Sequence, residues 1–465
     1  MSVSGQGAGT TPVVEFGRAH HGAPVYANAG GASAHAHADD STGEAPALHR
    51  GLIACKHCDT MHADVAVEPG GMALCSCCGY VLLRRSRFSI NFWSAFTATA
   101  LVVFAIANLF PLVQLTMLGK VVSTNFIGAL WDTWAGGQYI LSAMTGLMGF
   151  WFPLTQLCFL FWALGCLKRG ELPPDFRAAM RIYYFVGPWS MVPVLMLGII
   201  VAMVKFAGLA NLEPGPGVWA FAVLTFMMTA LSRFDTQRLW QYAQEGGLVD
   251  ASQDDGRPPH ELAACHACGY VQPWYAELGP APCRRCGITV HKRHEQTSTR
   301  VWALLIAAAV IYIPANVLPM MEIRSLLGSS QHTIVGGVIE LWRLGSWDLA
   351  IIVFVASVVV PITKLAALTL LMCIRRWHGV RSQRQRTRLY ELVEYIGQWS
   401  MLDVFVVVLM AAMANFPGVS QIIAGPAAAS FGAVVIFTML AAMSYDPRTG
   451  WDRRPRIPSD VTDER

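Results

Sequence analysis

Long apolar segments alternate with short polar ones along most of the chain. Each apolar segment is close to the length that a helix needs to cross a membrane, which is about 20 residues. The pattern therefore predicts an all-α polytopic membrane protein with eight transmembrane helices. The apolar segments cover residues 92–117, 139–165, 182–204, 217–232, 301–320, 348–374, 394–414 and 428–444.

The composition and the distribution of charge agree with a membrane location. Charged residues make up only 14% of the 465 residues and hydrophobic residues 54%, whereas soluble proteins carry about 25% charged residues. Basic residues gather in alternate loops, such as residues 168–181 and 375–388. Because positively charged loops stay in the cytoplasm, both termini are predicted to be cytoplasmic.

An internal repeat divides the chain. Three motifs recur 208 to 211 positions later, so the second half repeats the order of the first. Each unit has a cysteine-rich module followed by four apolar segments. Since four is even, both units enter the membrane in the same orientation, and their axis is predicted along the membrane normal. The paired motifs are ANLFPLVQL and ANVLPMMEI, VGPWSM and IGQWSM, and RFDTQRLW and SYDPRTGW.

The repeat and the composition predict seven parts. Residues 1–50 are rich in Gly, Ala and His, have no signal-peptide core and are expected to be disordered. The remaining parts are a first zinc ribbon at 51–87, a four-helix repeat at 88–240, a linker at 241–257, a second zinc ribbon at 258–296, a second four-helix repeat at 297–447 and a cytoplasmic tail at 448–465.

Eight cysteines form four CxxC pairs. A zinc ribbon needs two such knuckles, because each gives two thiolates to a tetrahedral four-cysteine site. The pairs predict two closed structural zinc sites that stabilise small domains without a large core. The predicted ligands are Cys55, Cys58, Cys75 and Cys78 in the first module and Cys265, Cys268, Cys283 and Cys286 in the second.

Other interpretations of the cysteines remain. A rubredoxin-like iron site uses the same four thiolates as zinc. A disulfide framework is disfavoured in the cytoplasm, and thioredoxin-like chemistry uses a single CxxC rather than paired knuckles. Cys77 is an additional thiol that we do not assign as a ligand.

Lys364 lies within the sixth apolar segment, and Asp403 lies within the seventh. A charge inside a membrane costs roughly 2.5–3.5 kcal/mol on insertion scales, so such residues tend to be functional. A Lys–Asp pair from adjacent helices would offset the cost, with Thr363 and Ser400 supplying hydrogen bonds. The functional hypothesis is a proton or substrate relay, and the alternatives are a static pair or a snorkelling lysine.

The first repeat lacks this charged pair. Alignment of the repeats places Gln156 opposite Lys364 and Pro193 opposite Asp403. The pair is therefore not a requirement of the repeated fold, which favours a functional role in the second half.

An asparagine precedes a proline by three residues near the end of the first helix of each repeat. The pairs are Asn108 with Pro111 and Asn316 with Pro319. Proline interrupts the helical hydrogen bonds, and an asparagine side chain can satisfy a backbone group that is left free. We interpret these residues as helix-break motifs with a structural role.

The cysteine modules, the two four-helix units and the three repeated motifs together resemble the paraquat-inducible protein A family, which also includes the lipophilic envelope-spanning tunnel protein A. The resemblance covers about residues 50–455. It departs from the terminal motif in the first half, where RFDTQRLW replaces the SYDPR form. It implies a component of the bacterial inner membrane that moves phospholipid or another lipophile with a periplasmic MCE-domain tunnel protein, and cytoplasmic domains of the zinc-ribbon type.

Several functions remain open from the sequence. The leading hypothesis is lipid transport, and the proton gradient is its natural energy source because the chain has no P-loop for ATP. A membrane thiol-disulfide oxidoreductase would need reactive CxxC thiols. A passive anchor for a tunnel protein would tolerate every polar substitution, and a small-molecule exporter would need no periplasmic partner. An enzymatic activity and nucleic-acid binding are not expected.

Overall fold

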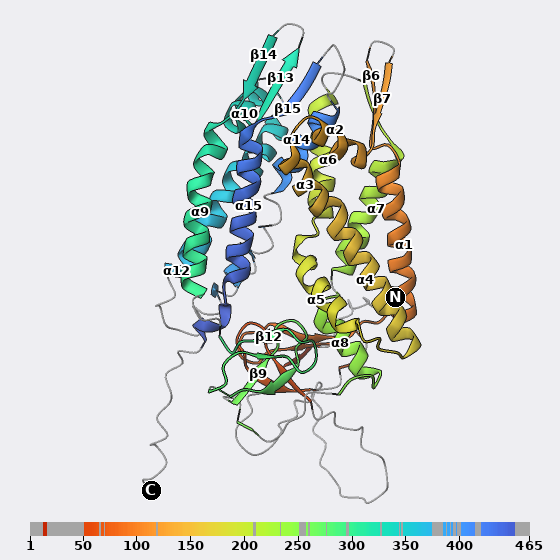
Figure 1. Cartoon of the computed structure of the whole chain (residues 1–465), viewed down its shortest axis with the longest axis vertical. Helices are drawn as coiled ribbons and strands as arrows, with labels where there is room; N and C mark the ends of the chain where they lie inside the picture. Colours follow the sequence, from red (N-terminus) through yellow and green to blue (C-terminus); the bar gives the residue numbers. More distant parts are fainter. Residues whose placement is uncertain are drawn as a thin grey trace, which may run out of the picture.

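The computed structural model is shown in Figure 1. Two groups of helices lie side by side, the cysteine modules lie together at one end, and two small sheets lie at the opposite end. We call these the ribbon end and the sheet end. The structure describes residues 13–15, 51–64, 67–68, 70–117, 120–207, 211–232, 234–250, 257–258, 261–275, 277–293, 297–325, 328–343, 345, 347–373, 385–386, 388–390, 392–393, 397, 401–413 and 420–451.

In the first repeat each predicted apolar segment contains helix, with breaks inside two of them, and two further helices, Phe126–Ala135 and Thr236–Glu245, lie outside these segments. A π-helix interrupts the second segment, and a 3-10 turn interrupts the third. The elements are α1 (Ile90–Leu109), α2 (Phe126–Ala135), α3 (Tyr139–Gly146), η1 (Leu147–Trp151), α4 (Phe152–Arg169), α5 (Phe176–Val186), η2 (Gly187–Trp189), α6 (Val192–Ala207), α7 (Pro216–Leu231) and α8 (Thr236–Glu245).

The second repeat has the same order of elements where it is described. Its π-helix η4 begins 208 positions after η1, so the irregularity belongs to the repeated fold. The elements are α9 (Thr297–Val317), α10 (Ile334–Arg343), α11 (Trp347–Phe354), η4 (Val355–Val359), α12 (Val360–Cys373), α14 (Leu402–Met413), α15 (Pro426–Ser444) and η7 (Pro447–Gly450).

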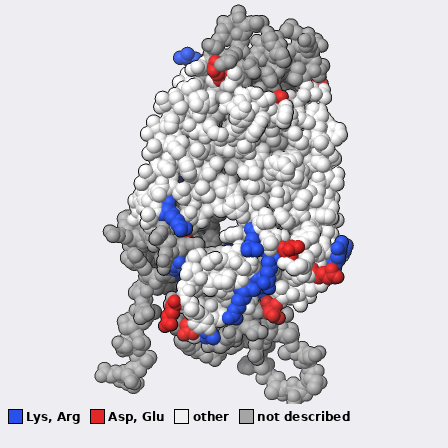
Figure 2. All heavy atoms as spheres, in the orientation of Figure 1, with Lys and Arg blue, Asp and Glu red and all other residues white. Residues whose placement is uncertain are grey.

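Six helical stretches of the described chain are long and apolar enough to cross a membrane, and the bent pair of α7 and α8 would make a seventh. In Figure 2 the middle band of the visible face carries almost no charge, and the charged residues gather mainly towards the ribbon end. These findings confirm a mostly helical, multi-pass membrane protein. The seventh predicted span, at 394–414, contains α14, but several of its residues lie outside the described part, so eight spans stay a prediction.

The sheet end contains β-structure that the hydropathy pattern did not predict. Each repeat contributes three antiparallel strands, in the orders β7-β6-β8 and β14-β13-β15. The predicted span 92–117 was therefore too long, since its last residues form a strand, whereas 301–320 ends just before one. The strands are β6 (Val113–Met117), β7 (Lys120–Thr124), β8 (Asn211–Pro214), β13 (Met321–Ser325), β14 (Gly328–His332) and β15 (Ser420–Ala424).

The change from helix to strand follows from the proline motifs. Helix α1 ends at Leu109, two residues before Pro111, which has no backbone N–H to donate. The carbonyl of Pro111 instead accepts a 3.0 Å hydrogen bond from the backbone N–H of Gly217, in the first turn of α7. The proline therefore ends one helix and helps to begin another.

The same arrangement recurs in the second repeat. The carbonyl of Pro319 accepts a 3.3 Å hydrogen bond from the backbone N–H of Ala427, in the first turn of α15. The turn before each of these helices passes so close to the proline carbonyl that a Cβ on Gly215 or Gly425 would collide with that oxygen. Both positions therefore require glycine.

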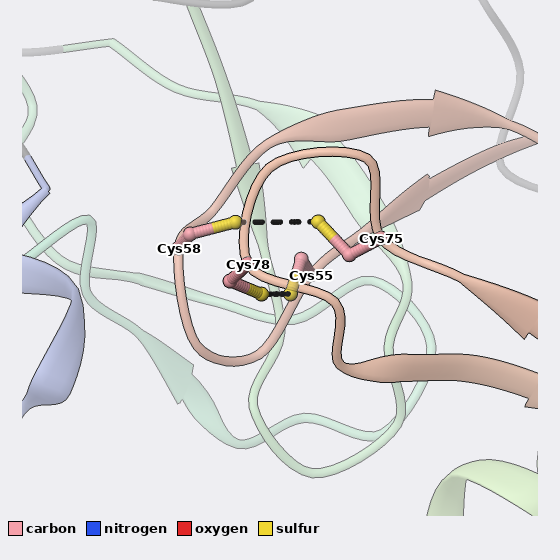
Figure 3. Close-up of side chains that lie close together, drawn as sticks. All are labelled: Cys55, Cys58, Cys75 and Cys78. Atoms are coloured by element: carbon pink, nitrogen blue, oxygen red, sulfur yellow. Dashed lines mark hydrogen bonds between the residues drawn. The ribbon is translucent and has the colours of Figure 1, made fainter. Parts of the chain in front are cut away.

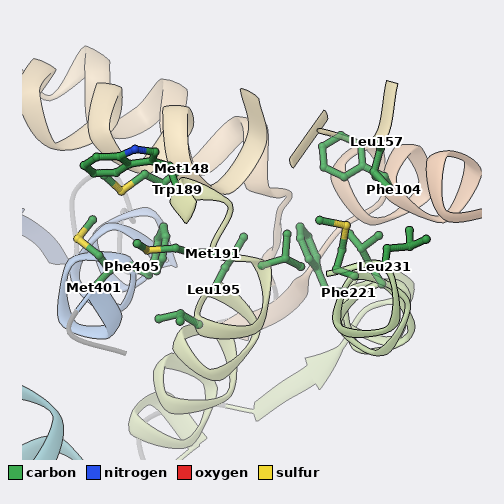
Figure 4. Packing of buried hydrophobic residues seen from close by; sticks show 14 of the residues in the cluster. Phe104, Met148, Leu157, Trp189, Met191, Leu195, Phe221, Leu231, Met401 and Phe405 are labelled. Atoms are coloured by element: carbon green, nitrogen blue, oxygen red, sulfur yellow. The ribbon is translucent and has the colours of Figure 1, made fainter. Parts of the chain in front are cut away.

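The two repeats meet along α6 and α14, which occupy matching positions in the repeat. Gly198 of α6 allows the close approach, because a Cβ there would lie only 3.0 Å from the Cβ of Phe405. Figure 4 shows Met191 and Met401, the methionines of the two WSM motifs, in the packed region that also contains Phe405. The repeated motif thus forms part of the core between the repeats.

The cysteine modules are built from short antiparallel hairpins, and each CxxC pair forms the turn between two strands. The strands are β2 (Leu52–Ala54), β3 (Met61–Ala63), β4 (Met72–Leu74), β5 (Val81–Arg84), β9 (Leu262–Ala264), β10 (Val271–Pro273), β11 (Ala281–Pro282) and β12 (Thr289–Val290). Within the tail predicted to be disordered, Val13–Glu15 forms a strand, β1, that pairs in parallel with the exposed edge of β4.

Candidate metal centres and intramembrane site

The eight predicted cysteines come together in two groups of four. Figure 3 shows the first group, in which the two knuckles face each other across the module. The Sγ–Sγ distance is 3.5 Å for Cys55 with Cys78 and for Cys58 with Cys75. In the second group the distances are 3.5 Å and 3.6 Å between the corresponding sulfurs.

This geometry fits a tetrahedral metal ion. Zinc–sulfur bonds of about 2.3 Å at tetrahedral angles place the sulfurs roughly 3.8 Å apart. In each group the four sulfurs lie within 4.8 Å of one another. Seven of the eight cysteines are buried, and Cys78 is half-buried. Two groups in the described chain can therefore each hold a metal ion through four sulfurs.

The thiols influence each other's protonation. Hydrogen bonds from the neighbouring cysteines hold the pKa of Cys75 and that of Cys283 below the ordinary value for a thiol. Thiolates form more readily under these conditions, and a thiolate is the form that binds metal.

The surroundings of the two groups differ. In the first module, Nε2 of His62 lies 3.3 Å from the Sγ of Cys75, and the hydroxyl of Thr60 lies 3.1 Å from the Sγ of Cys58. In the second module, Arg285 is buried, and its guanidinium lies 4.6 Å from the ring centroid of Tyr270. Hydrogen bonds to the sulfurs offset the negative charge of the first group, and a buried cation offsets that of the second.

Lys364 occupies α12 and is only 3% exposed. Among the described residues, no group forms a hydrogen bond with its Nζ. The ammonium lies against the backbone of Gly397, because a Cβ on that glycine would be 2.9 Å from Nζ. A buried charge is costly in a membrane, so a lysine at this position is expected to have a role that offsets the cost.

The structure describes only some of the other residues predicted around Lys364. Asp403 lies in α14, but its side chain is outside the described part of the structure, as is all of Ser400. Thr363 is exposed on the surface of α12, whereas its neighbour Lys364 is buried. The proposed pair of Lys364 and Asp403 therefore stays a prediction.

The first repeat has a neutral counterpart of this site. Gln156 of α4 is 8% exposed, and its Oε1 has no hydrogen-bond partner among the described residues. Pro193, which aligns with Asp403, lies in the first turn of α6. The two repeats thus bury a polar side chain at the same position, but only the second buries a charge.

The asparagines of the helix-break motifs act locally. Nδ2 of Asn108 donates a 2.8 Å hydrogen bond to the carbonyl of Phe104, and Asn316 makes the same contact with Tyr312. Both side chains therefore bond within the last turn of their own helix. These contacts give the asparagines a structural explanation.

Sequence reasoning missed the irregular backbone in the middle of the second and third spans. The third span breaks at Ser190, which is extended between η2 and α6. The backbone N–H of Met191 then contacts the carbonyl of Met148 in η1, at 3.5 Å. Broken helices and π-helices often mark functional positions. The only signal in the sequence was a proline near each irregularity.

The family model for paraquat-inducible protein A matches residues 90–244 and again residues 298–454. The chain belongs to the paraquat-inducible protein A family. The two matches fall on the two helical repeats, so each half carries the family pattern on its own. No solved structure matches the chain.

Named members of the family resemble the chain along most of its length. Intermembrane transport protein PqiA of Escherichia coli K12 is 29% identical over 418 residues, which covers 87% of this chain and 96% of the relative. Lipophilic envelope-spanning tunnel protein A of the same strain is 29% identical over 404 residues, covering 86% and 90%. A probable intermembrane transport protein of Haemophilus influenzae is 27% identical over 410 residues.

Proposed function

We propose that this protein is the inner-membrane component of a system that moves phospholipid or another lipophile through the bacterial envelope. The names of its relatives describe intermembrane transport and an envelope-spanning tunnel. The multi-pass helical fold provides a membrane part for such a system. The partner in this proposal is an MCE-domain protein that forms a hydrophobic tunnel across the periplasm.

The orientation follows from charge. The basic loop at residues 168–181 lies on the side of the cysteine modules. The positive-inside rule therefore assigns the ribbon end and both termini to the cytoplasm. The sheet end then faces the periplasm, where it is the part of the chain within reach of a tunnel protein.

The observation that carries the mechanism is the buried Lys364 without a described partner. A proton that moves from Lys364 to Asp403 would convert an ion pair into two neutral groups inside the second repeat. That change favours a different packing of α12 and α14, because each charge is costly in the membrane unless it is paired. Proton movement down its gradient would then drive the movement of lipid, and the protein itself would catalyse no reaction.

Zinc is the metal we assign to both four-cysteine groups. It would be held by Cys55, Cys58, Cys75 and Cys78 in one site and by Cys265, Cys268, Cys283 and Cys286 in the other. With four protein ligands, zinc acts as a structural cross-link and leaves no position for a substrate.

Elemental analysis together with thiol titration tests the metal assignment. Protein purified in mild detergent is expected to contain about two zinc ions per chain, with the eight ligand cysteines unreactive. Metal-free protein with reactive CxxC thiols would instead support the oxidoreductase, and iron in place of zinc would correct the metal alone.

Substitution of the charged residues tests the mechanism. Lys364→Gln introduces the residue that the first repeat has at this position, so the fold should tolerate it, and Asp403→Asn removes the other charge. Both variants are expected to lose envelope-barrier function in cells and proton-coupled lipid movement in proteoliposomes. Thr363→Ala, on the exposed face of the same helix, is the matched control and should behave as wild type.

The outcomes separate the alternatives. If the Lys364 and Asp403 variants both keep full function, the proton relay is wrong. If every intramembrane polar substitution is also tolerated, the passive anchor becomes the better explanation.

A further inference from the structure

The ribbon end joins two motifs that close the helical repeats. We call residues 233–240 and 444–451 the end motifs. In each, an aspartate caps a short helix: Asp235 accepts a hydrogen bond from the N–H of Arg238, and Asp446 accepts one from the N–H of Arg448, both at 3.0 Å. The two motifs therefore present matching residues to the cysteine modules.

One contact links each module to its own repeat. In both modules this contact is made by the residue that follows the first cysteine, which is Lys56 in the first module and His266 in the second. The ammonium of Lys56 lies 2.6 Å from a carboxylate oxygen of Asp235. His266 Nε2 lies 2.7 Å from a guanidinium nitrogen of Arg448.

A second contact links each module to the opposite repeat. It is made by the residue that follows the first knuckle, at Asp59 and at Gly269. A carboxylate oxygen of Asp59 lies 3.6 Å from Nη1 of Arg448. The side-chain amide of Gln237, which aligns with Arg448, lies 3.3 Å from the position that a Cβ on Gly269 would take.

The tryptophans of the end motifs also contact the module that belongs to the opposite repeat. Trp451, from the second repeat, packs in the cluster formed by cysteines of the first module. Trp240, its counterpart in the first repeat, lies 5.9 Å from the guanidinium of Arg285 in the second module. Each module is thus packed against the end of the other repeat.

Asp59 is the residue that departs from the repeated pattern. The other three knuckles are followed by Gly79, Gly269 and Gly287, all with φ between 72° and 80°. Asp59 has φ of 61° and is the only described residue other than glycine with a positive φ. A left-handed conformation disfavours most side chains, so the carboxylate should have a role that offsets this cost.

The contacts of that carboxylate supply the role. Its second oxygen lies 2.6 Å from Nη1 of Arg293, at the end of the second module, while the first faces Arg448. Arg448 is 3% exposed and also binds Asp446 with two hydrogen bonds of 3.0 Å. One side chain of the first module therefore meets both the second module and the end of the second repeat.

We propose that the two modules and the two end motifs form a clasp, in which Asp59 joins the first module to Arg293 and Arg448 and so holds the two repeats together at the ribbon end. The clasp follows the internal symmetry of the chain, and it does not depend on the nature of the transported molecule. Relative movement of the repeats in a transport cycle would hinge at the ribbon end and open at the sheet end.

Spin-label distances in the full chain test the clasp. One label replaces exposed Glu68 in the first module, and the other replaces exposed Met443 near the end of α15. The four cysteines that are not predicted ligands (Cys77, Cys158, Cys166 and Cys373) are changed to serine. The parent protein is expected to give one narrow distance distribution.

Two variants should loosen the clasp. Asp59→Gly suits the positive φ but removes the carboxylate, and Arg448→Gln removes its partner. Each is expected to widen the distance distribution at least twofold while the metal content stays that of the parent. Lys56→Gln, which breaks only the contact of the first module with its own repeat, is the matched control and should leave the width unchanged.

The direction in which the unfolding temperature changes gives an independent test of the clasp. If Asp59 served only as a turn residue, Asp59→Gly would raise the unfolding temperature, because glycine suits this φ better. The clasp requires the opposite, a lower unfolding temperature. Unchanged distances in both variants, or a raised unfolding temperature with Asp59→Gly, would overturn the proposal. If Asp59→Gly loses metal, Asp59→Asn, which tolerates the same φ, takes its place in both measurements.

Discussion

At the scale of single residues, the difference between the repeats is concentrated at Lys364 and Gln156. Both side chains are buried at the same position of a helix that follows a π-helix. The glycines Gly397 and Gly187, which align with each other in the two repeats, differ in what surrounds them. A Cβ on Gly397 would be 2.9 Å from Nζ of Lys364, whereas a Cβ on Gly187, its counterpart, would have no neighbour within 4 Å. Gly397 therefore sets the position of the ammonium.

Gly397→Ala should displace the Lys364 ammonium, because the end of a lysine side chain moves more easily than the backbone. If the relay depends on this position, transport falls about tenfold or more, since small displacements of a reacting group have effects of this size. Gly187→Ala is the control and should keep wild-type transport. The measurement is proton-coupled lipid movement in proteoliposomes.

Comparison with Lys364→Gln separates the need for the lysine from the need for its exact position. Normal transport in Gly397→Ala and loss in Lys364→Gln would mean that the lysine matters but its exact position does not. Normal transport in both would remove the lysine from the mechanism.

The metal groups and Lys364 show what residues alone can predict. The cysteine groups could be predicted because CxxC spacing fixes two ligands locally, and only the meeting of two knuckles had to be inferred. The surroundings of Lys364 could not, because Gly397 is 33 positions away and its contact depends on how two helices pack. Nor could the contacts of Asp59, since they join parts of the chain that only the folded structure brings together.

At the scale of elements, the ends of helices carry much of the polar chemistry. Asp446 caps η7 and binds the guanidinium of Arg448. Burial alone would raise the pKa of Asp446, but the hydrogen bonds and the charge of Arg448 hold it below the ordinary value of an aspartate. The charged form is therefore stabilised by folding.

Asp446→Asn should lower the free energy of unfolding by about 1.5–3 kcal/mol at pH 7, the range for hydrogen bonds to charged groups. Because the folded-state pKa is depressed, this contribution is fully present above the unfolded-state pKa, about 3.9. It is lost as the pH falls through the lower folded-state pKa. Wild type and variant should therefore converge as the sample is acidified.

The measurement is denaturant unfolding in mild detergent at a series of pH values, with metal content determined at each. Lys56→Gln breaks an ion pair whose side chains are about one third to one half exposed and should change stability by no more than about 1 kcal/mol. A difference between wild type and Asp446→Asn that does not depend on pH would show that the cap, rather than the charge, provides the stability.

Hydropathy located the long membrane helices but neither their interruptions nor the shorter helices α2, α8 and α10. Six predicted spans correspond to helices that are long and apolar enough to cross a membrane. A run of about 20 apolar residues is sufficient by itself to predict such a helix. The π-helices and the break at Ser190 lie inside apolar sequence, so composition does not change there. Strand β6 was missed for the same reason, since residues 112–117 continue the apolar sequence of α1. Strands β13 and β14 are more polar, with Glu322 and Arg324 in β13, and lie in a segment that hydropathy classes as a loop.

At the scale of the whole molecule, the two repeats meet in the membrane part and at the ribbon end. In the membrane part α14 packs against α6, α2 and α3, and at the ribbon end the repeats are joined by the proposed clasp. The sequence predicted the repeat from motifs in register, but it could not indicate which helices form the interface. That depends on small residues such as Gly198, whose role is visible only beside Phe405.

The α6–α14 contact yields a prediction for the assembly of the two halves. A Cβ on Gly198 would lie 3.0 Å from the Cβ of Phe405 and 3.7 Å from the backbone N of Val406. Gly198→Ala should therefore force the helices apart and cost about 1–3 kcal/mol of stability, the usual effect of overpacking. Gly198→Leu should cost more, because its side chain has no space between the helices.

Gly165→Ala is the matched control, because this glycine also lies in a membrane helix, α4, and a Cβ there would meet no atom within 4 Å. It should be neutral or slightly stabilising, since alanine is the better helix former. The measurement is thermal unfolding in detergent together with the metal content of each variant. Because the metal groups are remote from Gly198, a Gly198→Ala protein should keep its metal while its unfolding temperature falls. Unchanged stability would mean that the two helices can separate without cost, and that the contacts of α14 with α2 and α3 hold the repeats together in the membrane part.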